Sequence, residues 1–285
     1  MDTYHQKLLF DAYNELISQL KALDFMDSIT LIGEPVDKRV LDKVMDIDII
    51  QIVSFPMTIE KYNKIKEIYE EICKKYTTPE IDVIHAIACG PMKPKSFKEY
   101  EIFFHCLLFT EESYKELPMN TAKLSWQYHK PIKGKHLKSL QFFEAVTKDL
   151  LMNDVLGINN LIKLVSEDSS AYIGWETESE NKMKWSVYPL KFEHADEKAD
   201  LYIYAVLRCA SNALRFITKD NSFGIGHKMA QTFAERFPEL KSKNLPLDLV
   251  EGKKDLRNRR YHDDVCELKK QTLDFLNELK NHVED

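Results

Sequence analysis

The stretch from Ile29 to Val53 constrains the fold of this chain more than any other. It begins with a short apolar run that ends at Gly33, a residue that can turn sharply and lets another molecule approach the backbone. Twelve residues then lead to Asp46, which together with Asp48 heads a second apolar run rich in β-branched side chains. The pattern predicts two strands, with a glycine turn at the end of the first and two acids at the start of the second.

The two acids are expected on the same face of their strand, because Asp46 and Asp48 stand at positions i and i+2. Two carboxylates held that close repel each other unless a cation or a proton lies between them. A divalent metal resolves the repulsion, since Mg²⁺ takes one or two carboxylates together with substrate phosphate oxygens. The alternative is an acidic strand end that is simply wetted by solvent.

A third acid favours the metal interpretation. Asp82 lies in the apolar run of residues 80–87, about one predicted helix downstream of Asp48. If its strand is a neighbour of the strand that carries Asp46, three carboxylates gather from adjacent strands with the glycine turn opposite them. That arrangement indicates a two-metal site for phosphoryl transfer.

The pattern resembles the nucleotidyltransferase superfamily, which includes DNA polymerase β and the aminoglycoside nucleotidyltransferases. Its members carry an apolar strand, Gly-Ser, a spacer, Asp-x-Asp or Asp-x-Glu on a strand, and a further acid on a later strand. The residues that match in order and spacing are Gly33, Asp46, Asp48 and Asp82. Glu34 departs from the pattern, because the family has a small hydroxyl residue there that helps to hold the triphosphate. A carboxylate at this position would repel phosphates unless it points away or joins the metal shell.

The resemblance implies a metal-dependent enzyme that transfers a nucleoside monophosphate from a triphosphate, with ATP favoured, to a hydroxyl acceptor. Asp46 and Asp48 would hold two Mg²⁺ ions, and Asp82 would be a further metal ligand or the base on the acceptor. Gly33 and Glu34 would lie at the phosphates. A small-molecule hydroxyl, such as that of an aminoglycoside antibiotic, is the favoured acceptor, which would make the protein an antibiotic-resistance enzyme. A protein or RNA hydroxyl is the alternative acceptor.

Composition excludes several other classes of protein. The 285 residues are 44% hydrophobic, which is enough apolar material for a sizeable globular core. No apolar run reaches the length of a membrane span, and the N-terminus lacks a signal-peptide pattern. Five scattered cysteines without a Cys-x-x-Cys pair predict reduced thiols in a cytoplasm, not disulfides or a zinc site. The net charge of −6 gives no overall attraction to nucleic acid.

The order of the predicted elements indicates an α+β chain. A small mixed-sheet, nucleotidyltransferase-like domain is expected over residues 1–115, and an antiparallel helical bundle over 116–285. In the first domain, apolar spacing predicts helices over 4–23 and 58–75 and strands over 29–32, 47–53, 81–88 and 102–109. In the second, it predicts a helical stretch from 137 to 164 and helices over 195–218, 225–237 and 253–283, with Pro246 separating the last two. Residues 166–189 are interpreted as a loop or an exposed hairpin. This segment either lines the active site or only projects from the protein surface.

A second group of candidate site residues lies near the C-terminus. Arg257, the polar Asn258 and His262 resemble the motif of HEPN helical domains. In the family members that are ribonucleases, the resemblance implies an Arg that stabilises an RNA phosphate and a His that moves protons, acting across a homodimer. The plain alternative is a basic cluster on a solvated helix face.

Two further hypotheses therefore stand beside the transferase. One is a toxin–antitoxin-like fusion, in which the helical half cuts RNA and the sheet half restrains it. The other is a catalytically degenerate nucleotidyltransferase domain that serves as a binding module, which Glu34 favours.

Overall fold

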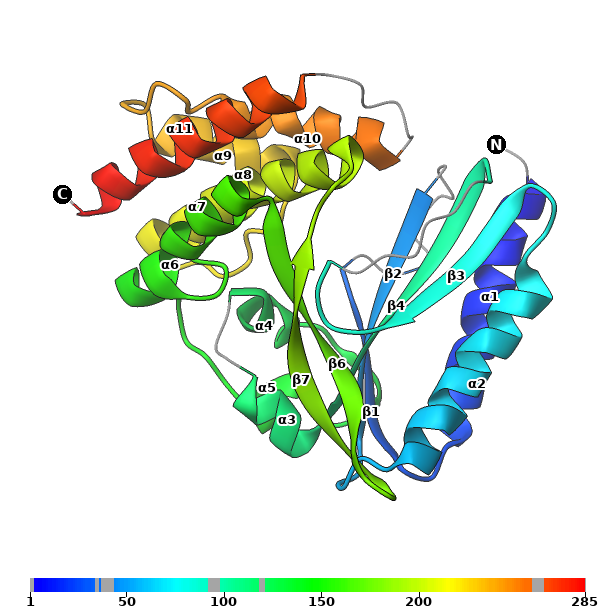
Figure 1. The fold of residues 1–285 in the computed structure, drawn as a ribbon. Coiled ribbons are helices and arrows are strands. Elements are labelled where there is room, and N and C mark those ends of the chain that lie inside the picture. Colours follow the sequence, from blue (N-terminus) through cyan, green and yellow to red (C-terminus); the bar gives the residue numbers. More distant parts are fainter. Residues whose placement is uncertain are drawn as a thin grey trace. The chain divides into compact units, whose positions relative to one another are not determined.

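The structure, a computed structural model, describes residues 3–33, 36, 44–91, 98–117, 121–257 and 264–284. The chain divides into two compact units that interleave along the sequence. The first unit comprises Met1–Leu117, Gln127–Gln141 and Ala171–Pro189, and the second comprises Pro118–Trp126, Phe142–Ser170 and Leu190–Asp285. A mixed sheet lies in the first unit and a set of helices makes up most of the second (Figure 1), so the predicted α+β class is confirmed.

The first unit is built on a five-stranded sheet with the strand order β3-β4-β2-β1-β5. Its strands are β1 (Met26–Ile32), β2 (Val44–Val53), β3 (Ile81–Ile87), β4 (Tyr100–Thr110) and β5 (Pro131–Gly134). β4 runs parallel to both β2 and β3, whereas β1 is antiparallel to both β2 and β5. Most positions of β4 are buried on both faces, as expected for a central strand with parallel neighbours on either side.

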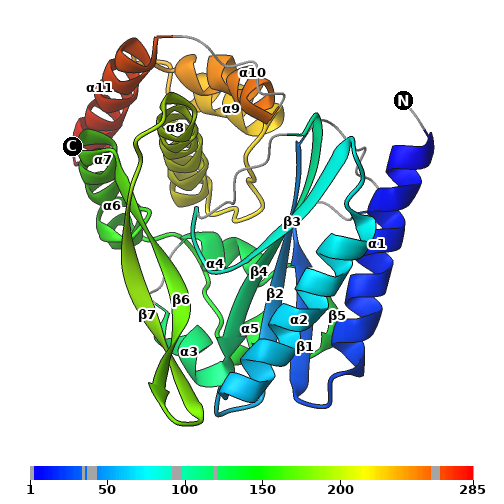
Figure 2. The ribbon, with the colours of Figure 1, turned by 45° about the vertical axis from the view of Figure 1, so that its right-hand side comes forward.

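Two helices, α1 (Thr3–Ala22) and α2 (Ile59–Tyr76), lie side by side on one face of this sheet (Figure 2). Their apolar positions recur at helical spacing and pack against the sheet residues that point the same way. The fully or nearly fully buried positions are Leu9, Ala12, Leu16 and Leu20 of α1 and Ile65, Ile68, Tyr69 and Ile72 of α2. The Thr58 hydroxyl accepts a hydrogen bond from the Lys61 N–H at 3.2 Å and so caps the start of α2. The shorter helices α3 (Glu111–Glu116) and α5 (Leu137–Leu140) complete the unit.

A β-hairpin made of β6 (Ser169–Ser179) and β7 (Lys182–Lys191) packs largely in the first unit, although in sequence it lies beyond residue 116. Ile173 and Cys89 exchange backbone hydrogen bonds of 2.7 and 2.8 Å. The Trp175 indole donates to the Leu108 carbonyl at 2.9 Å. Of the two interpretations of residues 166–189, the hairpin is therefore the correct one. Its relation to an active site stays a prediction.

The second unit is a set of helices packed around α8 (Ala195–Thr218). Its other helices are α4 (Thr121–Trp126), α6 (Lys148–Asn153), α7 (Ile158–Glu167), α9 (His227–Arg236), α10 (Leu245–Arg257) and α11 (Val265–Glu284). α8 is buried over most of its length, because α6, α7, α9, α10 and α11 all contact it. Among the described residues, no helix is both long and apolar enough to cross a bilayer.

The C-terminal helices differ from the prediction of a single helix over 253–283. α10 ends at Arg257, and α11 starts anew after Asp264, whose carboxylate accepts from the Cys266 N–H at 2.9 Å. Pro246 was predicted to separate two helices, but it lies in the first turn of α10. That position suits proline, because the N–H that proline lacks has no intrahelical partner in a first turn.

One charged cluster connects three helices of the second unit. Asp168 caps the end of α7 with a left-handed φ of 51°, and its carboxylate accepts hydrogen bonds from Tyr202 of α8 at 2.5 Å and from Lys269 of α11 at 2.8 Å. Lys198 is a further ion-pair partner at 3.3 Å. Burial alone would raise the pKa of Asp168, but the hydrogen bonds from Lys269, Tyr202 and Lys198 outweigh it and lower that pKa.

We expect Asp168→Asn to reduce the free energy of unfolding at pH 7 by about 1–3 kcal/mol, because charge-assisted hydrogen bonds are lost. Asparagine tolerates the left-handed backbone, so the effect isolates the charge. A carboxyl with a lowered pKa stabilises the fold above its ordinary pKa of about 4, and this contribution is lost as the pH falls through the lowered value. The difference between wild type and variant should therefore shrink in thermal unfolding at pH 3. A difference that does not change between pH 7 and pH 3 would contradict this account.

Candidate functional site

The two faces of β2 differ in chemistry. Ile47 and Ile49 point toward α1 and α2 and are fully buried in the core of the first unit. Asp46 and Asp48 alternate with them and so leave the opposite face, where both are partly exposed. The structure therefore places the two predicted acids side by side, on the face of the sheet that α1 and α2 do not cover.

Gly33 lies close to this pair because of the antiparallel register between β1 and β2. Ile32, the last residue of β1, is the register partner of Asp48, so the chain leaves the strand at Gly33 beside the start of β2. The φ of Gly33 is 80°, in the left-handed region that favours glycine. The predicted glycine turn and the predicted acids thus meet at one end of two paired strands.

A residue of β4 completes the arrangement. His105 is the parallel register partner of Asp48, and its Nδ1 lies 2.8 Å from Asp48 Oδ1. The imidazole ring stacks on Phe103, with 5.4 Å between the ring centroids and 21° between the planes. The side chain of His105 is 13% exposed and that of Asp48 is 37% exposed, so the histidine is the more buried member of the pair.

Asp82 does not lie beside the pair. β4 separates β2 from β3, so the condition of neighbouring strands is not met, and the two strands are about 10 Å apart at a spacing of about 4.8 Å per strand. Asp82 is the register partner of Glu101 on β4, and Glu101 is in turn the register partner of Val44 on β2. Val44 lies two positions before Asp46. The Asp82 carboxylate pairs with Lys98 at 3.3 Å. The structure brings Gly33, Asp46 and Asp48 together and leaves Asp82 two strands away.

Whether the protein can bind the predicted Mg²⁺ depends on which carboxylates the sheet brings together. Within the described residues, no three His, Cys, Asp or Glu side chains come close enough to hold a metal ion by themselves. Asp46 and Asp48 offer hard oxygen ligands on one face, and Mg²⁺ is commonly held by one or two carboxylates, with substrate phosphates and water as the other ligands. The donor set therefore fits an ion that arrives with a nucleotide, and it does not fit an all-protein metal cage.

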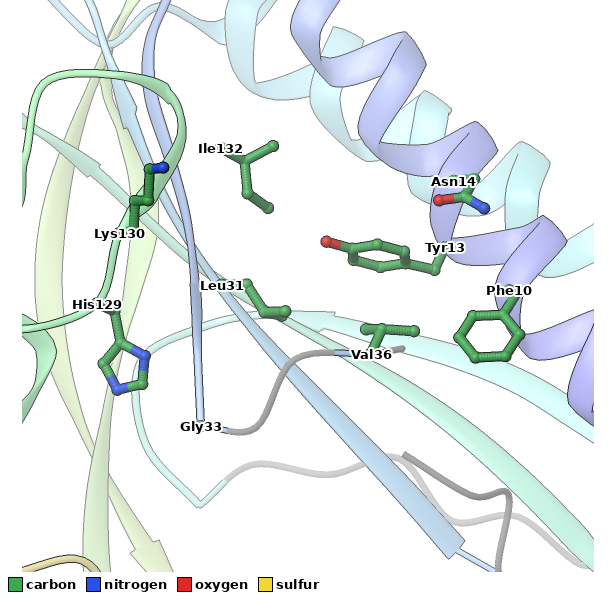
Figure 3. A pocket seen from close by; sticks show the side chains of 9 residues that line it. All are labelled: Phe10, Tyr13, Asn14, Leu31, Gly33, Val36, His129, Lys130 and Ile132. Carbon is green, nitrogen blue, oxygen red and sulfur yellow. The ribbon is translucent and has the colours of Figure 1, made fainter. Parts of the chain in front are cut away.

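A pocket of about 450 Å³ also borders Gly33 (Figure 3). Its lining residues come from α1, from β1, from two positions after β1, and from β5 and the two residues before it: Phe10, Tyr13, Asn14, Leu31, Gly33, Val36, His129, Lys130 and Ile132. Tyr13 extends from α1 toward Leu31 and Ile132. Leu31 packs against the same core as α1, so the pocket lies on the α1 side of β1, opposite the face that carries Asp48. Burial lowers the pKa of His129, so its ring is neutral at pH 7.

Three of the predicted site residues fall wholly or partly outside the described part of the chain. Glu34 and His262 lie outside the described residues. Arg257 is the last residue of α10, and only its backbone is described. The candidate ribonuclease site of Arg257 and His262 therefore stays a prediction, as does the place of Glu34 at the phosphates.

The sequence does not point to His105 as a site residue, because it stands inside an apolar run that predicts a strand. Nor does it point to Glu101, the buried acid that pairs in register with Asp82. The one signal for His105 in the sequence is a titratable residue inside an otherwise apolar run. That signal gives no partner, because the contact with Asp48 joins residues 57 positions apart.

The comparisons with known proteins identify no family. No protein-family model matches the chain, and no curated protein matches it. Among solved structures, the chain is similar to the spectinomycin adenyltransferase AAD(9) from Enterococcus faecialis, determined with ATP and spectinomycin. The identity is 14% and the TM-score 0.47, over the whole of both chains. A likeness of that strength carries no argument about activity, so the function is argued from the residues of this chain.

Proposed function

We propose that this protein is a metal-dependent nucleotidyltransferase that moves a nucleoside monophosphate from a nucleoside triphosphate, ATP being favoured, to a hydroxyl group of a small molecule. The observation that carries the proposal is the placement of Asp46 and Asp48 on one face of β2, where both are partly exposed, with the turn at Gly33 beside them. A positive-φ glycine lets phosphates approach the backbone, and paired carboxylates next to it suit the cations that accompany those phosphates.

The reaction we propose balances as a single displacement. The acceptor hydroxyl oxygen bonds to the α-phosphorus of ATP, the bond from that phosphorus to the bridging oxygen breaks, and pyrophosphate leaves with the bond electrons. The hydroxyl proton passes to a base or to water. Asp46 and Asp48 would hold the Mg²⁺ ions, which neutralise charge on the phosphates and position the reacting oxygens. Gly33 would keep the backbone close to the triphosphate.

Asp82 has a different place in this proposal from the one that the sequence predicts. At about 10 Å across the sheet from β2 and paired with Lys98, it is poorly placed to share an ion with Asp46. Asp46 and Asp48 alone therefore carry the proposed metal contacts. Substituting Asp82 separately would show whether it contributes on the acceptor side.

Calorimetric titration of the purified protein with each of the four nucleoside triphosphates, with and without Mg²⁺, tests the proposal. We expect at least one triphosphate to bind more tightly with the metal than without it, and Asp48→Asn to weaken that metal-dependent binding, because a metal ligand is removed. Asp11→Asn, an exposed acid on α1, is the matched control and should bind as the wild type does. The absence of metal-dependent binding for all four nucleotides would overturn the proposal, and RNA cleavage dependent on His262 would then be tested.

A further inference from the structure

We propose that His105 is a positioning residue that holds the Asp48 carboxylate in the orientation needed to receive a metal–nucleotide complex. This inference rests on the proposed function, because it assigns a role to a neighbour of a proposed metal ligand. Nothing in the sequence pattern that led to Asp46 and Asp48 includes this histidine.

The contact is built into the sheet. Asp48 and His105 are direct register partners on the parallel strands β2 and β4, so both side chains leave the same face at the same level. The separation of 2.8 Å between Nδ1 and Oδ1 is that of a charge-assisted hydrogen bond from a nitrogen donor to a carboxylate. Because β4 is an interior strand, paired with β3 on one side and β2 on the other, and is buried along most of its length, the donor is anchored more firmly than a side chain on an edge strand would be.

The imidazole ring is itself held in place. Stacking on Phe103, which is 4% exposed, fixes one face of the ring. His105 Nε2 is buried and has no hydrogen-bond partner among the described residues. A buried polar atom left without a partner is costly, so packing efficiency alone does not account for a histidine here. The hydrogen bond to Asp48 is the polar interaction that the structure shows for this ring.

The hydrogen bond leaves part of the carboxylate for a ligand. His105 engages only Oδ1, and the Asp48 side chain remains 37% exposed. A carboxylate has two oxygens and about four acceptor positions, so one donor does not exhaust it. Residues that orient metal ligands in this way typically contribute about 10-fold to 100-fold to metal affinity. His105 would therefore act through Asp48 and not by touching the substrate.

Two substitutions separate this role from packing. His105→Phe keeps an aromatic ring against Phe103 but removes the donor. His105→Asn shortens the side chain but places an amide N–H about where Nδ1 lies. The fold of each variant is checked by far-ultraviolet circular dichroism and thermal unfolding. If the hydrogen-bond donor is what His105 contributes, the asparagine variant binds ATP with metal more tightly than the phenylalanine variant. If packing of the ring is what it contributes, the order of the two affinities is reversed.

Calorimetry with ATP, titrated with Mg²⁺, with Mn²⁺ and without metal, provides the readout. We expect His105→Phe to weaken metal-dependent ATP binding by about 10-fold or more, without changing metal-free binding. His105→Asn should recover most of that affinity. In an Asp48→Asn background, His105→Phe should have little further effect, because the residue through which it acts is already altered.

Three results would overturn the inference: unchanged metal-dependent affinity in His105→Phe, an equal loss in metal-free binding, or a full additional loss in the Asp48→Asn background. The proposed function fails separately, when the wild-type protein shows no metal-dependent nucleotide binding. That result would remove the inference with it. Wild-type binding that His105→Phe leaves intact would remove the inference alone.

Discussion

Asp46→Asn is expected to lower the rate of nucleotidyl transfer by about 1,000-fold or more while leaving the fold intact. The carboxylate oxygens of Asp46 supply part of the proposed metal contacts on β2, and metal stabilisation of transition-state charge is worth several kcal/mol, at about 1.4 kcal/mol for each factor of ten in rate. An amide keeps the shape of the side chain but not its charge. Because Asp46 is only partly buried and points away from the core under α1 and α2, its substitution should have little effect on stability.

The measurement is transfer of label from α-phosphate-labelled ATP to a panel of hydroxyl-bearing acceptors, aminoglycosides first, in the presence of Mg²⁺. Asp11→Asn is the matched control, since it makes the same chemical change on an exposed position of α1 and should retain wild-type activity. Circular dichroism and thermal unfolding show whether Asp46→Asn is folded. A folded Asp46→Asn protein with full activity would refute the assignment of Asp46 and Asp48 as the metal-binding pair.

The elements that could be predicted from the sequence are those whose signals lie within a single helix or strand. α1 and α2 were predictable because their buried positions, such as Leu9, Leu16 and Ile65, recur at helical spacing within one element. The strands were predictable from short β-branched runs bounded by turn residues. The start of α11 was not, because the predicted helix also took in the mostly charged residues 253–264, whereas the apolar stripe begins at Val265 and the helix begins only after the Asp264 cap.

The order of strands could not be predicted from these local signals. β3 follows β2 along the chain through α2, yet β4, the next strand in sequence, lies between them. Parallel pairing is formed by residues far apart in sequence, and apolar runs of similar length do not specify which partner each strand takes. The grouping of Asp82 with Asp46 required their strands to be neighbours, which depended on that unknown order, and the structure does not meet this condition.

The residues of the candidate site differ in the same way, because some are marked by local sequence signals and others only by long-range pairing. Asp46 and Asp48 were found because their relation is local, two residues apart on one strand. Gly33 was found because a glycine at the end of an apolar run is a turn signal, and the register then places it beside Asp48. His105 reaches the site only through the pairing of β2 with β4, so its role is visible only once the sheet is assembled.

Gly134 stands where the structure leaves no room for a side chain. Gly134 ends β5 with a φ of 75°, and a Cβ atom placed on it would lie 1.8 Å from the Asp27 carbonyl oxygen. The neighbouring atom is backbone of β1, so a rotamer change cannot relieve the clash. Ser28, the register partner of Gly134, donates to the Lys135 carbonyl at 2.8 Å and holds the two strands at this separation.

We therefore expect Gly134→Ala to lower the free energy of unfolding of the first unit by about 3 kcal/mol or more. The left-handed backbone alone costs about 1–3 kcal/mol for a residue other than glycine, and relief of the clash requires β5 to move away from β1. Urea unfolding followed by tryptophan fluorescence measures the change, because Trp175 and Trp185 both belong to this unit. Since β5 pairs with residues Ser28 to Thr30 of β1, the strand that leads to Gly33, metal-dependent nucleotide binding should weaken in the same variant.

The matched control for Gly134→Ala is Gly224→Ala, at a position where an added Cβ meets nothing within 4 Å. That substitution should change the free energy of unfolding by less than about 1 kcal/mol, since it introduces no clash and reduces the entropy of the unfolded chain. If the two variants unfolded at the same urea concentration, the close approach of β5 to β1 at Gly134 would be refuted. A large loss confined to Gly134→Ala would instead show that the edge of the sheet next to Gly33 depends on the absence of a side chain at this position.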